Sequence, residues 1–185
     1  MTYANPAPLG LACIALTTWL LNMVNVGWFD ASAMPMVLAM AFALGGTTQF
    51  CAGLLEFPRG NTFGFVVFCS YGAFWWSLAL FVEFFAAKVP AAFVGWYLFI
   101  WGAFTFVLWL ASAALNRVIQ SIFLSGWLGL LALAVSDWTG MPVLHVAGGY
   151  LGLLTALLAF YLAAAEVINE TRGRAVLPVG AYVPA

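Results

Sequence analysis

Six long apolar segments dominate this chain, and only short polar turns separate them. They lie near residues 9–27, 33–55, 63–87, 91–115, 117–137 and 143–168. Each is close to the roughly 20 mostly apolar residues that an α-helix needs to cross the hydrocarbon core of a bilayer. The pattern therefore predicts an all-α, polytopic membrane protein with six transmembrane helices in a single domain over residues 1–185.

The scarcity of charged residues supports this prediction. Of the 185 residues, 66% are hydrophobic and only 6% are charged, whereas a soluble domain carries about 25% charged residues. Such a chain cannot cover itself with a water-compatible surface, so we expect a lipid bilayer to surround it. No basic run points to nucleic acid. Cys13, Cys51 and Cys69 lack metal-ligand spacing, so we expect neither a metal nor a cofactor.

Proline and basic residues predict how the helices begin and how they are oriented. Pro35, Pro90 and Pro142 each stand near the start of a segment, where the missing N–H of proline would be unpaired in any case. Lys88 is the one basic residue in an odd-numbered loop, whereas four arginines occupy the even-numbered loops and the C-terminal tail: Arg59, Arg117, Arg172 and Arg174. By the positive-inside rule, we expect a multi-pass protein of the inner (cytoplasmic) membrane with both termini in the cytoplasm.

Polar residues recur at helical spacing inside the apolar segments. They form stripes in four or five segments, such as Thr18-Asn22-Asn25, Gln49-Gly53-Glu56, Ser70-Phe74-Ser77, Arg117-Gln120-Ser121 and His145-Gly148-Gly152-Thr155. One interpretation is hydrogen bonding and close packing between helices. The other is that the stripes converge on a wet path with mostly uncharged walls, which suits a small anion or its neutral acid. His145, the sole histidine, is either a structural donor or a proton-sensitive group in the pore mouth.

The most informative stretch is Asn5-Pro6-Ala7-Pro8-Leu9-Gly10. It has the features of a helix start, because Asn5 can cap and prolines in the first turn leave few N–H groups unpaired. The partial positive charge at such a helix end attracts carboxylates. Helix ends that point at a substrate recur in membrane transporters, so we expect Asn5 and the first-turn N–H groups to bind a substrate carboxylate.

Further motifs follow this stretch along nearly the whole chain. They are Ala52-Gly-Leu-Leu-Glu56, Gly60-Asn-Thr-Phe-Gly64, Ser70-Tyr-Gly72 with Phe74-Trp75, Glu166-Val-Ile-Asn-Glu170 and Gly173-Arg-Ala-Val-Leu-Pro178. Together with the N-terminal motif, they resemble the acetate uptake transporter (AceTr) family. The resemblance implies membrane transport of acetate and related small carboxylates, with succinate a possible second substrate. It also implies a hexamer in which each protomer has its own path.

The resemblance further implies where the path narrows. In the family an aromatic residue, a tyrosine and a leucine form the constriction, and the matching positions here are Ile14, Tyr71 and Gly126. Two of the three side chains are smaller than in the family, so we expect a wider constriction. The polar stripes and the resemblance together predict these pore residues: Asn5, Pro6, Ala7, Pro8, Leu9, Gly10, Ile14, Thr17, Thr18, Asn22, Gln49, Ser70, Tyr71, Phe74, Gln120, Gly126 and His145.

Two questions about function stay open at the level of sequence. The resemblance does not separate a proton-coupled carrier from an anion channel. A different class, a non-transporting membrane sensor or scaffold that binds acetate, is the alternative, although the chain shows no soluble output domain that would carry a signal. We expect no enzyme, because nothing in the sequence resembles a catalytic triad, a metal site or a nucleotide-binding loop.

Overall fold

The computed structural model describes residues 4–180, which form a bundle of six helical spans. The spans are Ala7–Asn25, Ala31–Arg59, Thr62–Lys88, Ala91–Ser112, Arg117–Thr139 and Pro142–Arg172. All six are long and apolar enough to cross a membrane, so the predicted number of transmembrane helices is confirmed. The last span extends past the predicted segment because its apolar stretch continues into the polar residues Glu166–Arg172 without a helix-breaking residue before Gly173.

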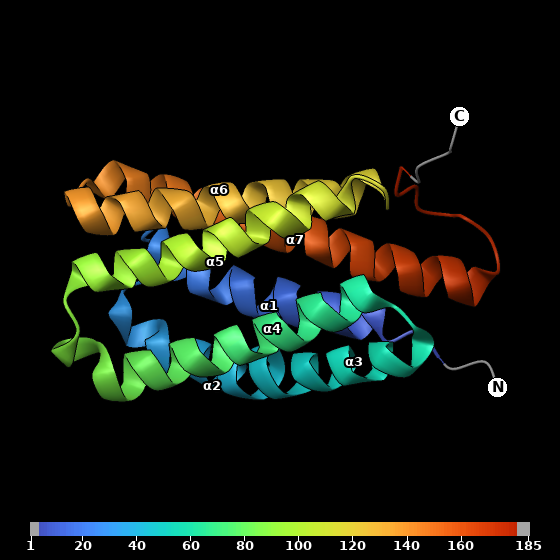
Figure 1. The fold of residues 1–185 in the computed structure, drawn as a ribbon, viewed down its shortest axis with the longest axis horizontal. Helices are drawn as coiled ribbons and strands as arrows, with labels where there is room; N and C mark the ends of the chain where they lie inside the picture. Colours follow the sequence, from blue (N-terminus) through green and yellow to red (C-terminus); the bar gives the residue numbers. More distant parts are fainter. Residues whose placement is uncertain (1–3, 181–185) are drawn as a thin grey trace.

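Helix α1 (Ala7–Asn25) runs through the middle of the bundle (Figure 1). On one side of it, α5 (Ala91–Ser112), α6 (Arg117–Thr139) and α7 (Pro142–Arg172) pack next to one another, with α7 against α1. On the other side, α3 (Gln49–Glu56) packs against both α1 and α4 (Thr62–Leu80). The described chain begins and ends at the same end of the bundle (Figure 1), which we call the terminal end.

The second and third spans combine several kinds of helix. The second consists of a 3-10 turn η1 (Ala31–Ala33), α2 (Met34–Met40), a π-helix η2 (Ala41–Thr48), α3 and a 3-10 turn η3 (Phe57–Arg59). The third ends in a π-helix η4 (Phe81–Phe85) and a 3-10 turn η5 (Ala86–Lys88). A Cβ on Gly45 of the π-helix η2 would lie 2.8 Å from the ring of Trp75. Glycine is therefore what allows the third span to pack closely on this wider stretch.

Prolines and asparagines start the helices. Pro35 and Pro142 lie in the first turns of α2 and α7, and Pro90 is the N-cap of α5. The structure thus confirms the three predicted helix starts. Asn61 and Asn116 cap α4 and α6 by accepting a hydrogen bond from a first-turn N–H, which satisfies donors that no helical carbonyl can reach.

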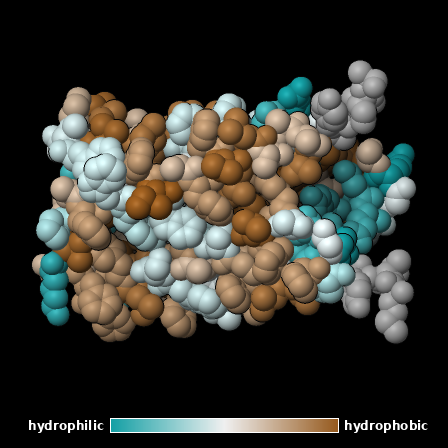
Figure 2. Space-filling view, in the orientation of Figure 1, coloured by the Kyte–Doolittle hydropathy of each residue, from teal (hydrophilic) through white to brown (hydrophobic). Residues whose placement is uncertain are grey.

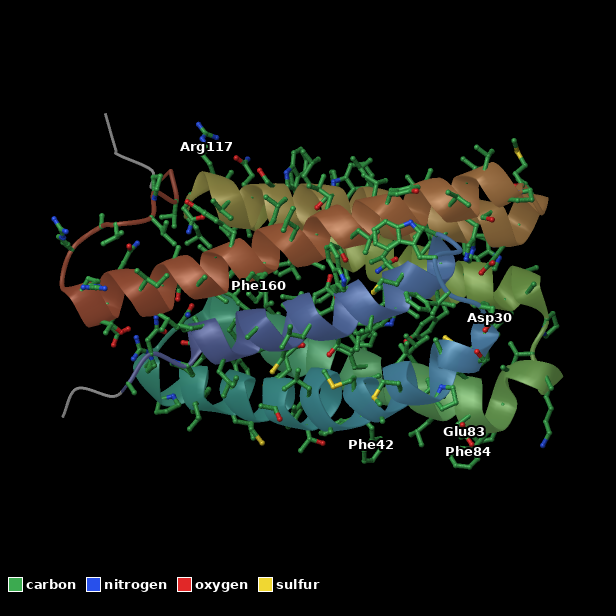
Figure 3. The ribbon with its side chains drawn as sticks, turned by 180° about the vertical axis from the view of Figure 1, so that it is seen from behind. Asp30, Phe42, Glu83, Phe84, Arg117 and Phe160 are labelled. Atoms are coloured by element: carbon green, nitrogen blue, oxygen red, sulfur yellow. The ribbon has the colours of Figure 1, made fainter. Side chains whose placement is uncertain are left out.

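The outer surface of the bundle suits a bilayer. Figure 2 shows strongly hydrophilic residues confined to the two ends of the visible face, most of them at the terminal end. Figure 3 shows Arg117 at the terminal end and Asp30 and Glu83 at the opposite end. Between the ends, the side chains of Phe42 and Phe160 are more than half exposed. Apolar sides between polar ends are what a membrane-spanning bundle requires.

Candidate functional site

A cavity of about 360 Å³ lies inside the bundle, between α1, α4, α5, α6 and α7. Most of its lining is apolar. The polar side chains that line it are Thr18, Asn22, Asn25, Tyr71, Thr105, Asp137, His145 and Thr155. A largely apolar cavity with a few placed polar groups is typical of a small-molecule site.

A second cavity, of about 190 Å³, lies toward the terminal end of the bundle. Its polar lining comes from Asn61, Asn116 and Glu166, and Ala7 at the start of α1 lines it as well. Asn61 and Asn116 cap the helices on which they stand, so these helix starts position the polar part of the smaller cavity.

Three apolar side chains line both cavities: Ile14 of α1 and Ile122 and Phe123 of α6. The two cavities therefore adjoin at these residues. An edge-to-face contact with Phe63, at a ring-centroid distance of 5.5 Å, holds the Phe123 ring in place. Placed end to end, the two cavities outline an interior route, and these three apolar side chains form a pinch between them.

Tyr71 and Gly126 lie in the larger cavity and not at this pinch. The three residues expected to form one constriction therefore lie at different places. Ile14 lines both cavities, whereas Tyr71 and Gly126 line only the larger one. The Tyr71 hydroxyl is hydrogen-bonded to the hydroxyl of Thr105. A Cβ on Gly126 would lie 3.6 Å from Cγ2 of Thr105 and 3.8 Å from Cγ2 of Thr155. Gly126 thus leaves a hollow in the wall between two threonines.

The polar side of the larger cavity is built on α1. The Asn22 amide donates to the Thr18 carbonyl at 2.8 Å, and the Asn25 amide donates to Oδ1 of Asn22 at 3.0 Å. A Cβ on Gly152 of α7 would overlap the Asn22 amide. The glycine is therefore what allows α7 to pack directly on this pair of asparagines.

At the terminal end, Asn5 links the segment before α1 to α7. Its Nδ2 donates to Oε2 of Glu166 at 3.0 Å, and its Oδ1 accepts the N–H of Ala7 at 3.2 Å. The next two first-turn N–H groups donate to the carbonyl of Pro6. Pro6, not Asn5, occupies the N-cap position of α1. The Asn5 amide and the first-turn N–H groups, which we expected to meet a substrate carboxylate, therefore have hydrogen-bond partners within the protein.

A second acid lies near Glu166. Glu56 is fully buried, and its Oε2 accepts from the Asn61 amide at 3.0 Å and lies 3.7 Å from Nε of Arg59. Arg59 also donates to the carbonyl of Ala4 at 2.8 Å. One arginine thus ties the N-terminal segment to the turn between α3 and α4 and offsets part of the negative charge.

The structure brings about half of the predicted pore residues to the cavities. Seven line the larger cavity: Ile14, Thr18, Asn22, Tyr71, Phe74, Gly126 and His145. Ala7 and Ile14 line the smaller one, and Asn5 binds Glu166 in its wall. The others line neither of these two cavities: Pro6, Pro8, Leu9, Gly10, Thr17, Gln49, Ser70 and Gln120.

Side-chain direction explains several of these absences. Thr17 and Gln49 are fully buried in helix contacts away from the cavities. Ser70 donates to the Val66 carbonyl of its own helix at 2.5 Å. Gln120 accepts from Arg117 at 2.9 Å at the terminal end. The Ser70 hydroxyl is thus satisfied by its own helix. By contrast, Thr17 Oγ1 and both polar atoms of the Gln49 amide are buried without a hydrogen-bond partner among the described residues.

The sequence-based prediction missed Ile122, Phe123 and Thr105. Ile122 and Phe123 precede Gly126 by four and three residues, so helical spacing places them on its face of α6. Thr105 is the one polar side chain among the cavity-lining residues of α5. Both signals are present in the sequence, although neither shows which face of the helix points inward.

A six-helix membrane bundle with an interior route belongs to the class of transporters and channels. The chain belongs to the GPR1/FUN34/yaaH family, whose profile matches residues 1–181. This confirms the resemblance that the motifs indicated.

Two curated relatives and one solved structure show how close the similarity is. The succinate-acetate/proton symporter SatP of Escherichia coli is 42% identical, over 96% of this chain and 95% of its own. Acetate permease A of Emericella nidulans is 33% identical, over 97% of this chain and 67% of its own. The solved structure of the bacterial acetate channel SatP superposes with a TM-score of 0.93 at 40% identity, covering 97% of this chain and 100% of the other.

Proposed function

We propose that this protein moves acetate and related small carboxylates, succinate among them, across the membrane along a path inside each chain. The observation that carries the proposal is the interior route formed by the two cavities that adjoin at Ile14, Ile122 and Phe123. Its relatives support the choice of substrate, since the matched proteins are named as acetate or succinate–acetate transporters and an acetate channel.

The lining of the larger cavity suits such a substrate. Apolar walls accommodate the methyl group of acetate. The Asn25 amide of α1 donates one of its two N–H groups to Asn22, and the other can donate to the acetate carboxylate. Neutral donors hold an anion less tightly than an arginine or lysine does. Weak binding favours passage, because a path must release its solute as readily as it accepts it.

Uptake of labelled acetate into proteoliposomes tests this function. We expect wild-type protein to accumulate label above protein-free liposomes and Ile14→Trp to abolish most of the uptake by filling the pinch. The matched control is Leu157→Trp, which makes a similar aliphatic-to-Trp change on the exposed outer surface of α7 and should leave uptake intact. Acetate binding without uptake would favour the sensor or scaffold alternative.

The same assay addresses the mechanism. A carrier coupled to protons should concentrate acetate when an inward proton gradient is imposed, whereas a channel should only equilibrate it.

We propose both termini in the cytoplasm by the positive-inside rule. Arg117 lies at the terminal end, and Asp30 and Glu83 lie at the opposite end (Figure 3). Arg59 and Arg172 are the last residues of η3 and α7, also at the terminal end.

We also propose that subunits assemble as a hexamer with one path in each. Large apolar side chains are exposed along the sides of the bundle, including Phe42, Phe93 and Phe160, and such surfaces can pack against lipid or against a neighbouring copy. Native mass spectrometry from lipid nanodiscs tests the proposal: six copies are expected, and a monomer at all concentrations would exclude the hexamer.

A further inference from the structure

One acid and one base face the larger cavity near the end opposite the termini. Asp137 lies in the last turn of α6 and His145 in the first turns of α7, and a two-residue turn joins these helices. Both side chains are half-buried and line the cavity. They therefore face the same space from two adjacent helices.

These two side chains are the principal charge in the cavity. Among the described residues, Tyr71 is the one other titratable side chain that lines the cavity. The Tyr71 hydroxyl is hydrogen-bonded to the Thr105 hydroxyl. The other helices contribute only neutral side chains around the pair: Asn22 and Asn25 from α1, Met34 from α2, Phe81 and Val82 from η4, and Val94 and Leu98 from α5. An unscreened charge in such a setting acts strongly on any ion that passes.

We propose that Asp137 and His145 form a charge filter that admits a carboxylate anion to the larger cavity when His145 is protonated. The inference rests on the proposed transport function. With a neutral imidazole, the carboxylate of Asp137 repels the anion. With an imidazolium, the two charges cancel and the anion enters an electrically neutral mouth. Because lower pH favours the protonated form of an imidazole, the filter opens toward acid pH.

Other charged side chains lie at this end but outside the cavity. Asp30 and Glu83 lie there (Figure 3), and Lys88 ends η5 at the same end, although none of the three lines the cavity. Hydrogen bonds from the Ser32 side chain and backbone N–H hold the pKa of the Asp30 carboxyl below its usual value, so it stays ionised near neutral pH. Asp30 is therefore a matched control for a negative charge outside the cavity.

Isotope exchange at equal pH on both sides tests the filter, because no proton gradient then contributes a driving force. Difluoroacetate is a suitable probe, since it remains ionised throughout the pH range. We expect the wild-type half-saturation concentration to rise roughly tenfold between about pH 5.5 and pH 8. Asp137→Asn should keep it at or below the wild-type value at about pH 5.5 throughout the range, because the repelling carboxylate is gone and a protonated His145 then attracts the anion. His145→Gln should hold it near the high value, and the double variant should show no pH dependence.

Asp30→Asn should retain the wild-type pH profile. Size-exclusion chromatography of each variant checks that folding and assembly are unchanged, and Asp137→Asn tests the filter by itself if His145→Gln does not fold. A pH profile that persists in the double variant overturns the filter. Absence of any acetate or difluoroacetate exchange by the wild type overturns the proposed function instead.

Discussion

The hydrogen bond between Asn5 and Glu166 joins the segment before α1 to the second half of α7, beside the smaller cavity. Asn5→Asp would place two carboxylates at this contact. Losing a hydrogen bond to a charged group costs about 1.5–3 kcal/mol, so we expect a lower unfolding temperature and reduced acetate exchange. Combining Asn5→Asp with Glu166→Gln restores the bond with donor and acceptor exchanged.

Thermal unfolding and acetate exchange of the three variants separate two roles of Asn5. Recovery of both stability and exchange in the double variant would show that Asn5 acts through Glu166. Recovery of stability alone would show that the Asn5 amide contacts the substrate itself, because the charge at position 5 would still repel a carboxylate.

Gly126 is the second residue at which a single substitution tests the site, because it leaves a hollow in the wall of the larger cavity. Gly126→Leu would fill the space between Thr105 and Thr155, and a larger acid needs more of that space than acetate does. We therefore expect the variant to depress lactate exchange severalfold more than acetate exchange, as measured by competition in proteoliposomes. Equal loss for both acids would contradict a role in substrate size.

Close approach between helices depends on glycine at the contact of α1 and α7. Gly152→Ala would bring a Cβ into the Asn22 amide, whereas Gly126→Ala would meet its nearest neighbour at an ordinary 3.6 Å. Overpacking of this kind typically costs about 1–3 kcal/mol. We expect Gly152→Ala to lower the unfolding temperature clearly and Gly126→Ala to leave it almost unchanged. The reverse order would show that α1 and α7 do not pack as described.

The polar stripes of the sequence predict which side chains share a helix face, but not whether that face lines the cavity. Thr18, Asn22 and His145 face the larger cavity as their stripes suggested, whereas Ser70 and Gln120 do not. Spacing along a helix identifies residues that share a face, but the rotation of the helix in the bundle selects the face that points inward. That rotation depends on side chains of other helices.

For the whole molecule, the direction of insertion follows from the distribution of charge between the two ends. In a background without the native cysteines, Ala31→Cys and Thr139→Cys should react with an impermeant maleimide added to intact cells, since both exposed positions lie at the end opposite the termini. Pro58→Cys should react only after the membrane is opened. Labelling of Pro58→Cys in intact cells would reverse the proposed orientation.

The sequence alone determined the membrane class, the six spans and the family. Each follows from local information, because a span needs only a continuous run of apolar residues and a motif only a few neighbouring ones. Helix starts at Pro35, Pro90 and Pro142 were predictable for the same reason.

Only the tertiary structure decided where the route runs and narrows. The pinch combines Ile14 of α1 with Ile122 and Phe123 of α6, which are far apart in the chain. Likewise, only the tertiary structure places the Asn5 amide against Glu166 of the last helix. Such contacts depend on how all six helices pack at once, and no local pattern in the sequence records that packing.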